Sequence, residues 1–437
     1  MNKRQEHPIH KTLQAKSKFF CPAKWNELFL YLNHGNTNSC HHPIPHKIPA
    51  ELLDDPFVLH NTPHKLKMQQ LMMEGQRPEE CHMCWHVEDS DPDVLSDRFH
   101  KSVDWKNDIP HLQVDSHYVP KFIEVVFDNT CNLNCSYCDP GQSTQWASKV
   151  QKQPLDLETD YRNLYNKIHI QNGVSDDLYF KAWLNWWPLI ADQVRTLKIS
   201  GGEPLISNNF WNFVNILIET QYPHLNFSIN SNFSVNPDYI DRFSGLSKHF
   251  QKLNVSASID ATGSIAEYSR QNLNYELFLD NTHRFCTDSA DNCFYKLQST
   301  VNILNIFGLR EKLQLHIDLR KRYGTKISDF YSTVVRFPEF QSISLLPDSI
   351  KKDQFDELDS WYNQNHKYLT ESEKHLVKKT TSYLENSPER LYDLDTDKLL
   401  IDFKRFLIYS NKTSKLNYQN IYPQSFVQWV DNIKLDS

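Results

Sequence analysis

Short β-type runs separated by stretches with helical periodicity dominate the middle of the chain, and they most restrict how it can fold. Such runs lie at 121–127, 196–200, 225–230, 253–259, 295–304 and 341–346. The intervals between them contain helical patterns, for example from Leu178 to Val194 and from Phe210 to Ile218. Strands that alternate with helices form βα units around a parallel sheet. Six such strands predict an α/β fold with an open, partial (β/α)6 barrel of the TIM type over 119–349.

The two flanking segments differ from this central part. Residues 1–118 are rich in His, Pro and polar residues, and their apolar patches, such as that at 28–31, are short. This pattern predicts an irregular, cysteine-rich N-terminal module. From about 350 onward, apolar residues recur at three- and four-residue spacing. The sequence therefore predicts a helical C-terminal extension over 350–437.

The composition excludes several classes of protein. The 437 residues are 39% hydrophobic and 23% charged, which favours a packed protein over a disordered one. The net charge of −7 and the scattered Lys and Arg residues do not indicate nucleic-acid binding. The N-terminus lacks an apolar run of signal length, and no stretch approaches about 18 uncharged apolar residues. We therefore expect a cytoplasmic protein with no membrane partner.

Three closely spaced cysteines follow the first predicted strand. Cys131, Cys135 and Cys138 lie on one short loop at the end of a strand where barrel enzymes place their chemistry. A [4Fe–4S] cluster has four irons, so three thiolates leave one iron open to a substrate or cofactor. A structural zinc site would need a fourth ligand, which this loop does not supply. The sequence predicts a catalytic [4Fe–4S] cluster on these three cysteines.

The motif C-x-x-x-C-x-x-C, with the aromatic Tyr137 directly before the last cysteine, resembles the hallmark of the radical SAM superfamily. The resemblance covers roughly 121–350. It implies that the open iron binds S-adenosylmethionine and that the reduced cluster splits this cofactor to a 5′-deoxyadenosyl radical. That radical abstracts hydrogen from a substrate. The resemblance also implies an electron donor such as flavodoxin or ferredoxin.

Further positions match the family in order. Gly201, Gly202, Glu203 and Pro204 follow the second strand and resemble the GGEP turn that contacts the amino group of the cofactor. The chain has only ten glycines, and an adjacent pair at a strand end permits close backbone approach to a ligand. After the third strand, Asn232 lies in a segment similar to the family's TNG-like stretch.

In that stretch Phe233 replaces the family's glycine. After the fourth strand, Ser258 and Asp260 resemble the residues that meet the cofactor's ribose, and Arg270 matches an arginine that often meets its carboxylate. Hydroxyl, carboxylate and guanidinium groups are suitable partners for these functions. Ordinary capping and surface charge remain alternative roles for these three residues.

A second set of cysteines lies in the N-terminal module, as Cys21, Cys40, Cys81 and Cys84. The pair Cys81 and Cys84 has metal-ligand spacing. Four thiolates can hold either a [4Fe–4S] cluster or a zinc ion, and spacing does not separate the two. The string from Arg77 to Glu88 resembles an auxiliary SPASM or twitch module, which favours a second cluster. Here it precedes the core, whereas in the family it usually follows.

Other candidate residues have less specific patterns. Cys286 and Cys293 lie outside both sets, and such cysteines are usually inert core residues rather than thiyl donors or ligands. The N-terminal histidines could replace one metal ligand, although surface or capping roles are the alternative. Helix packing is predicted for Trp183, Trp186 and Trp187.

The resemblance implies C–H activation on a peptide or protein side chain, by analogy with relatives that carry auxiliary clusters. One alternative is a radical SAM enzyme that acts on a small metabolite or nucleotide. Another is a non-catalytic iron–sulfur protein for electron transfer or assembly. The segment from Gly201 to Pro204 and Arg270 favours an enzyme, because an electron carrier has no use for cofactor-binding residues.

Overall fold

A nine-stranded sheet organises the chain. The computed structural model describes residues 3–91, 93–166, 175–386 and 395–435. The strand order is β11-β10-β8-β7-β6-β4-β1-β2-β3, and the seven strands from β11 to β1 are parallel. The strands are β1 (Glu27–Tyr31), β2 (Asn36–Asn38), β3 (His46–Lys47), β4 (Phe122–Val126), β6 (Thr196–Ser200), β7 (Tyr222–Ser231), β8 (Phe250–Ser258), β10 (Cys293–Val301) and β11 (Tyr331–Val334).

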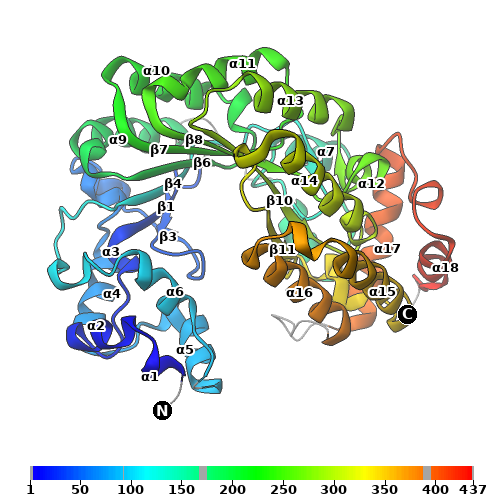
Figure 1. The fold of residues 1–437 in the computed structure, drawn as a ribbon, viewed down its shortest axis with the longest axis horizontal. Helices are drawn as coiled ribbons and strands as arrows, with labels where there is room; N and C mark the ends of the chain where they lie inside the picture. Colours follow the sequence, from blue (N-terminus) through cyan, green and yellow to red (C-terminus); the bar gives the residue numbers. More distant parts are fainter. Residues whose placement is uncertain (1–2, 92, 167–174, 387–394, 436–437) are drawn as a thin grey trace.

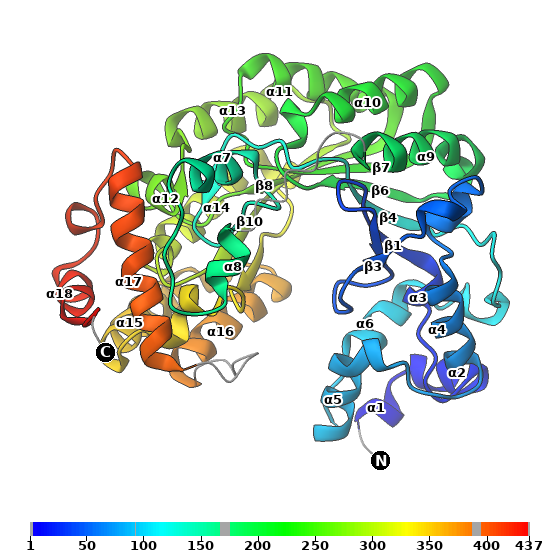
Figure 2. The ribbon, with the colours of Figure 1, turned by 180° about the vertical axis from the view of Figure 1, so that it is seen from behind.

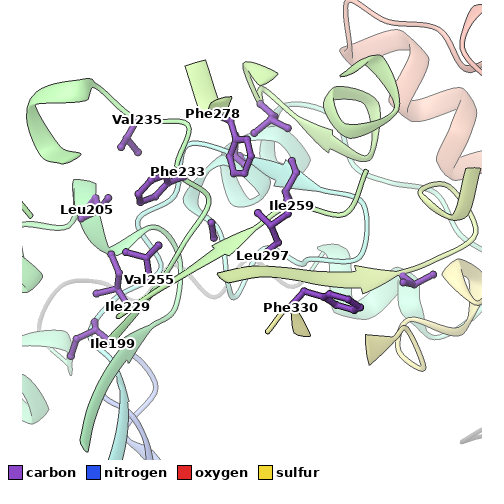
Figure 3. Packing of buried hydrophobic residues seen from close by; sticks show 14 of the residues in the cluster. Ile199, Leu205, Ile229, Phe233, Val235, Val255, Ile259, Phe278, Leu297 and Phe330 are labelled. Carbon is purple, nitrogen blue, oxygen red and sulfur yellow. The ribbon is translucent and has the colours of Figure 1, made fainter. Parts of the chain in front are cut away.

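One face of the sheet is apolar and packs against helices. Ile199, Ile229 and Val255 are neighbours across β6, β7 and β8, and all three are buried (Figure 3). Because strand side chains alternate between faces, the other face carries the intervening polar residues. The apolar face is covered by α9 (Ser175–Ile190), α10 (Asn208–Thr220), α11 (Pro237–Ser244), α13 (Tyr275–Asp288) and α14 (Leu309–Tyr323) (Figure 1).

The polar face of the sheet is concave. Figure 1 shows the sheet curving so that β1 and β11, near its two ends, lie on the same side of the central strands β6, β7 and β8. Figure 2 shows the N-terminal and C-terminal helices at these opposite ends.

The N-terminal residues are more regular than predicted. They form α1 (Lys3–Glu6), α2 (Ile9–Lys16), α3 (Ala23–Asn26), α4 (Pro63–Met73), α5 (His82–Ser90) and α6 (Asp97–Asp104). A separate hydrophobic core, with Phe20, Trp25 and Trp85 among its residues, packs these helices together. The prediction of an irregular module was wrong because short apolar patches suffice when they meet in such a core. Since β1 pairs with β4, the sheet also crosses residue 118, and the division into three domains stays a prediction.

The C-terminal helices are present as predicted. They are α15 (Asp348–Asn365), α16 (Glu371–Asn386), α17 (Thr396–Thr413) and α18 (Gln424–Asn432), and shorter helices elsewhere are α7 (Thr144–Lys152), α8 (Tyr161–Asn166) and α12 (Gly263–Ser269). Within the described ranges, no helix combines the length and the apolar character needed to cross a bilayer.

The predicted strand at 341–346 was wrong. Residues 339–341 and 343–345 form short 3-10 turns, and Ser342 Oγ accepts a hydrogen bond from the Ser344 amide at 3.2 Å. A serine that satisfies nearby backbone groups competes with a strand ladder. The strand beside β10 is instead β11, which starts at Tyr331. With β1 as well, the observed parallel sheet has seven strands rather than six.

Candidate active site

The loop that carries Cys131, Cys135 and Cys138 is fixed on several sides. It follows β4 and includes β5 (Asn134–Cys135), which pairs with β9 (Arg270–Gln271). Trp146 Nε1 of α7 donates a hydrogen bond to the Cys135 carbonyl at 2.9 Å. Because the partners of this loop come from distant segments, its shape depends on the complete fold.

The three thiols line one cavity of about 200 Å³ at the carboxyl ends of the strands. Burial raises the pKa of Cys131 to about 12, and the neighbouring Cys135 thiol adds to the effect. Burial also raises the pKa values of Cys135 and Cys138. Three thiolates around one cavity would need a positive partner, because their charges repel one another. The predicted residues that line this cavity are Cys131, Cys135, Tyr137, Cys138, Gly201, Gly202, Asn232, Ser258 and Arg270.

The cavity also holds a polar atom without a partner. Asn230 Oδ1 is buried and has no hydrogen bond among the parts of the chain that the structure describes. An unsatisfied buried acceptor costs stability, so a bound molecule with a donor group would stabilise the site. Three thiols around an open, partly polar cavity fit a cluster with one iron left for a ligand. The residues present therefore fit a [4Fe–4S] cluster together with S-adenosylmethionine.

The glycine pair lies against the cysteine loop. Gly201 has φ 115°, a conformation that side chains other than glycine rarely adopt. A Cβ added at Gly202 would lie 2.2 Å from the carbonyl oxygen of Thr130, the residue directly before Cys131. Glycine at 202 is therefore required by the close approach of two backbone segments.

The substitution Gly202→Ala is expected to displace the cysteine loop. An atom forced into backbone at that distance costs about 1–3 kcal/mol of stability. We expect a lower melting temperature and loss of most iron from the Cys131 loop after anaerobic reconstitution, measured by thermal denaturation and iron analysis. Gly245→Ala is the matched control, because its added Cβ meets no atom within 4 Å. Equal iron content in the two variants would contradict this account.

Glu203 lies behind the cavity rather than in its lining. Its carboxylate accepts hydrogen bonds from the amides of Leu205 at 3.1 Å and Asn232 at 2.6 Å, and from Ser231 Oγ at 2.8 Å. Burial raises the pKa of Glu203 to about 7, against the effect of these donors. The side chain therefore ties the end of β7 to the glycine turn. Pro204 is buried and starts the short 3-10 helix of 204–206.

The substitution Glu203→Gln tests this tie. A glutamine places its amide N–H₂ against one of the donors, which leaves two donors facing each other. We expect a loss of about 1–3 kcal/mol in the free energy of unfolding, measured by urea denaturation. Glu276→Gln, which changes an exposed glutamate, should leave stability within about 0.5 kcal/mol. An equal effect of both substitutions would show that Glu203 is not a structural tie.

Arg270 and Asp260 form a buried ion pair. Arg270 Nε donates to Asp260 Oδ2 at 2.8 Å, and the Tyr137 hydroxyl donates to the same oxygen at 3.0 Å. Arg270 Nη1 lies 3.5 Å from Cys135 Sγ. Asp260 does not line the cavity, whereas Arg270 and Tyr137 do. In this arrangement Asp260 orients the guanidinium towards the cysteine loop.

Phe233 takes the place of the glycine in the TNG-like stretch of the radical SAM superfamily. Its φ is 57°, in the left-handed region that favours glycine. The ring is fully buried and packs against Phe285 and Tyr295. Burial of a large aromatic side chain offsets the backbone strain at this position. The neighbouring Asn232 donates a hydrogen bond from Nδ2 to Asn132 Oδ1 at 2.7 Å, which connects β7 to the cysteine loop.

The four N-terminal cysteines line a second cavity, together with Arg98 and Lys101. Burial, and then the charges of Cys81, Cys84 and Cys40, raise the pKa of Cys21. Burial acts in the same direction on Cys40, but a hydrogen bond from His41 and the charge of Lys101 lower its pKa overall. Four thiols with cationic neighbours are suitable ligands for a metal centre.

The spacing of the thiols bears on the type of metal centre. A zinc ion with Zn–S bonds of about 2.3 Å brings its sulfurs to roughly 3.8 Å from one another. Among the described residues, the groups of three or more candidate ligand atoms within 4.8 Å of one another contain no cysteine. The thiols of neither set therefore lie as close together as a bound zinc ion would hold them.

Two tight groups that the sequence did not predict lie near the four cysteines. They are His41, His42 and Asp97, and His46, His64 and Glu80. His42 Nε2 is 2.8 Å from Asp97 Oδ2, and His64 Nε2 is 2.6 Å from Glu80 Oε2. The histidine-rich composition of this segment was the available signal, but the carboxylate partners are distant in sequence.

The remaining candidates lie in the core. Cys286 and Cys293 are buried in the main hydrophobic core and line neither cysteine cavity. Trp183, Trp186 and Trp187 are also fully buried, and Trp183 packs against Phe213. Helix packing is therefore confirmed for the three tryptophans.

Comparisons of the sequence and of the structure with known proteins find little similarity. No family model matches the chain, and no curated protein matches it. Among solved structures, the chain is similar to Streptococcus suis SuiB bound to precursor peptide SuiA, with a TM-score of 0.34 and 10% identity. That match covers 78% of this chain and 70% of the SuiB chain.

Proposed function

We propose that the protein is a radical SAM enzyme that reductively cleaves S-adenosylmethionine at a [4Fe–4S] cluster. One observation carries the proposal. Three half-buried cysteines, a glycine pair and Arg270 line one cavity at the carboxyl ends of parallel strands. Residues from six separate segments line this cavity, and a chain that merely stored iron would not need the glycine pair or the guanidinium.

The residues of the cavity have distinct roles in this proposal. Cys131, Cys135 and Cys138 would hold the cluster, which when bound supplies the electron that splits the carbon–sulfur bond of the cofactor. Gly202 permits the close approach of the cofactor-binding turn to the cysteine loop. Ser258 offers a hydroxyl to the ribose, and Arg270 offers a cation on the cavity wall. Asp260 and Glu203 act as positioning residues, because neither lines the cavity.

We assign a second [4Fe–4S] cluster to Cys21, Cys40, Cys81 and Cys84. The resemblance of the string from Arg77 to Glu88 to an auxiliary SPASM or twitch module supports this choice over zinc, and cations line the cavity of the four thiols. Four thiolates leave no iron open, so the role of such a cluster would be electron transfer or scaffolding.

The proposed substrate is a peptide or protein side chain that undergoes C–H activation. Side chains on the concave face, such as Lys198, Asn254 and Lys296, are half-buried and line an open cavity. An open polar face favours an extended chain over a small metabolite, which needs an enclosed pocket. The proposal includes a flavodoxin or ferredoxin as electron donor and a location in the cytoplasm.

Electron paramagnetic resonance tests this function directly. After anaerobic reconstitution with iron and sulfide, the dithionite-reduced protein should give a [4Fe–4S] signal that changes shape when S-adenosylmethionine is added. The change is expected because the cofactor binds the open iron. A verified cluster whose signal does not change when S-adenosylmethionine is added would contradict the proposal and favour a non-catalytic iron–sulfur protein.

A further inference from the structure

An ammonium group without a partner lies on the concave face of the sheet. Lys296 of β10 lines a further cavity, distinct from the two cysteine cavities. This cavity has a volume of about 330 Å³, and Lys198 and Asn254 also line it. In the described part of the chain the Nζ atom of Lys296 makes no hydrogen bond or ion pair, and the carboxylate of Glu124 acts on it only through its charge. Lys198 differs, because its Nζ lies 3.1 Å from Glu124 Oε2. Burial, and then the charge of Lys198, lower the pKa of Lys296.

This arrangement is unfavourable for the protein alone. Two lysines share one carboxylate, so the cavity keeps an excess positive charge. A half-buried cation without a hydrogen-bonding partner loses hydration that nothing in the protein replaces. Such a group is expected where a ligand of opposite charge binds, since the ligand then supplies the missing partner.

The position of Lys296 relates it to the cysteine cavity. Strand register places Lys296 opposite Ser256, and Ser256 opposite Asn230, which lines the cysteine cavity. Gln298, two residues further along β10, lines that cavity as well. Two residues of a strand span about 7 Å. The two cavities are therefore successive layers of one polar face.

We propose that Lys296, assisted by Lys198, binds a carboxylate of the substrate, so that the substrate is an acidic peptide. The carboxylate of an aspartate or glutamate would lie one layer, about 7 Å, from the residues that face the cysteine cavity. It would thereby position a neighbouring part of the peptide at the reaction site. The choice of a peptide rests on the function proposed above, whereas the anion-binding role of Lys296 does not.

Calorimetric titration of the full chain with an acetylated, amidated triglutamate peptide tests this site without any cluster. At low salt we expect binding that is at least about fivefold weaker in Lys296→Met, because a charge-assisted contact is lost. Lys248→Met removes an exposed lysine and should change the affinity by less than about twofold. Triglutamine, which is uncharged, should bind much more weakly than triglutamate.

Thermal denaturation separates a binding defect from misfolding. Since Lys296 has no partner to lose, Lys296→Met should melt at or above the wild-type temperature. A lower melting temperature would contradict the unpartnered state. Absence of triglutamate binding, or an equal loss in both lysine variants, would overturn the proposal. Inorganic phosphate that binds through Lys296 more tightly than triglutamate would assign the site to phosphate and also overturn it. Failure to cleave S-adenosylmethionine would leave this result unchanged.

Discussion

Cys135→Ala is expected to reduce S-adenosylmethionine cleavage to background and to remove about four of about eight iron atoms per chain. Cys135 lies in the middle of the cysteine loop, and its carbonyl accepts the hydrogen bond from Trp146. The backbone bond survives in alanine, so the loop should keep its shape while losing one thiolate. Two thiolates hold a cubane cluster poorly. Iron analysis and chromatography for 5′-deoxyadenosine measure the two losses.

Cys286→Ala is the matched control for this substitution. It removes a buried thiol that lines neither cysteine cavity. We expect full iron content and full cleavage, apart from a modest loss of stability through the small void. Cleavage that survives in Cys135→Ala, with iron content unchanged, would exclude the Cys131 loop as the catalytic site.

Cys84→Ala is expected to separate the two metal centres. The N-terminal cysteine cavity lies beside a separate hydrophobic core and shares no lining residue with the cavity of Cys131, Cys135 and Cys138. Loss of one of four thiolates should remove about four irons while S-adenosylmethionine cleavage stays within about threefold of wild type. Formation of the modified substrate should be impaired, because the second cluster is proposed to serve electron transfer or scaffolding rather than cleavage of S-adenosylmethionine.

Cys293→Ala is the control for the N-terminal set, since it removes a buried core thiol. It should retain all the iron of the wild type. Iron loss from Cys84→Ala identifies the site as a cluster. Zinc in its place, found by metal analysis of protein purified without reconstitution, would contradict the second cluster. Unimpaired product formation would contradict its proposed role.

Local pattern predicted much of the central fold. Strands at 121–127, 196–200, 225–230, 253–259 and 295–304 were confirmed within a few residues, because buried parallel strands have strong β-type composition. The helices α9 and α10 were confirmed because their apolar residues recur with helical periodicity. The two cysteine sets were visible as spacing, and the structure gathers each set around one cavity.

The missed features depend on contacts between distant segments. β1 joins the sheet only through its partner β4, some ninety residues later, and its short apolar patch gave no local sign of this. The composition of residues 341–346 is typical of a strand, but the Ser342 side chain accepts a hydrogen bond from the backbone amide of Ser344. Lys296 looked like an ordinary strand lysine, and its lack of a partner depends on the three-dimensional surroundings.

The central claim is cleavage of S-adenosylmethionine at the cluster of Cys131, Cys135 and Cys138. The most direct test is chromatography for 5′-deoxyadenosine after anaerobic reconstitution, with S-adenosylmethionine and dithionite added. We expect 5′-deoxyadenosine from the wild type even without substrate, at a slow rate, and none from Cys135→Ala. No 5′-deoxyadenosine from a protein with two verified clusters, even with an acidic peptide present, would contradict the claim.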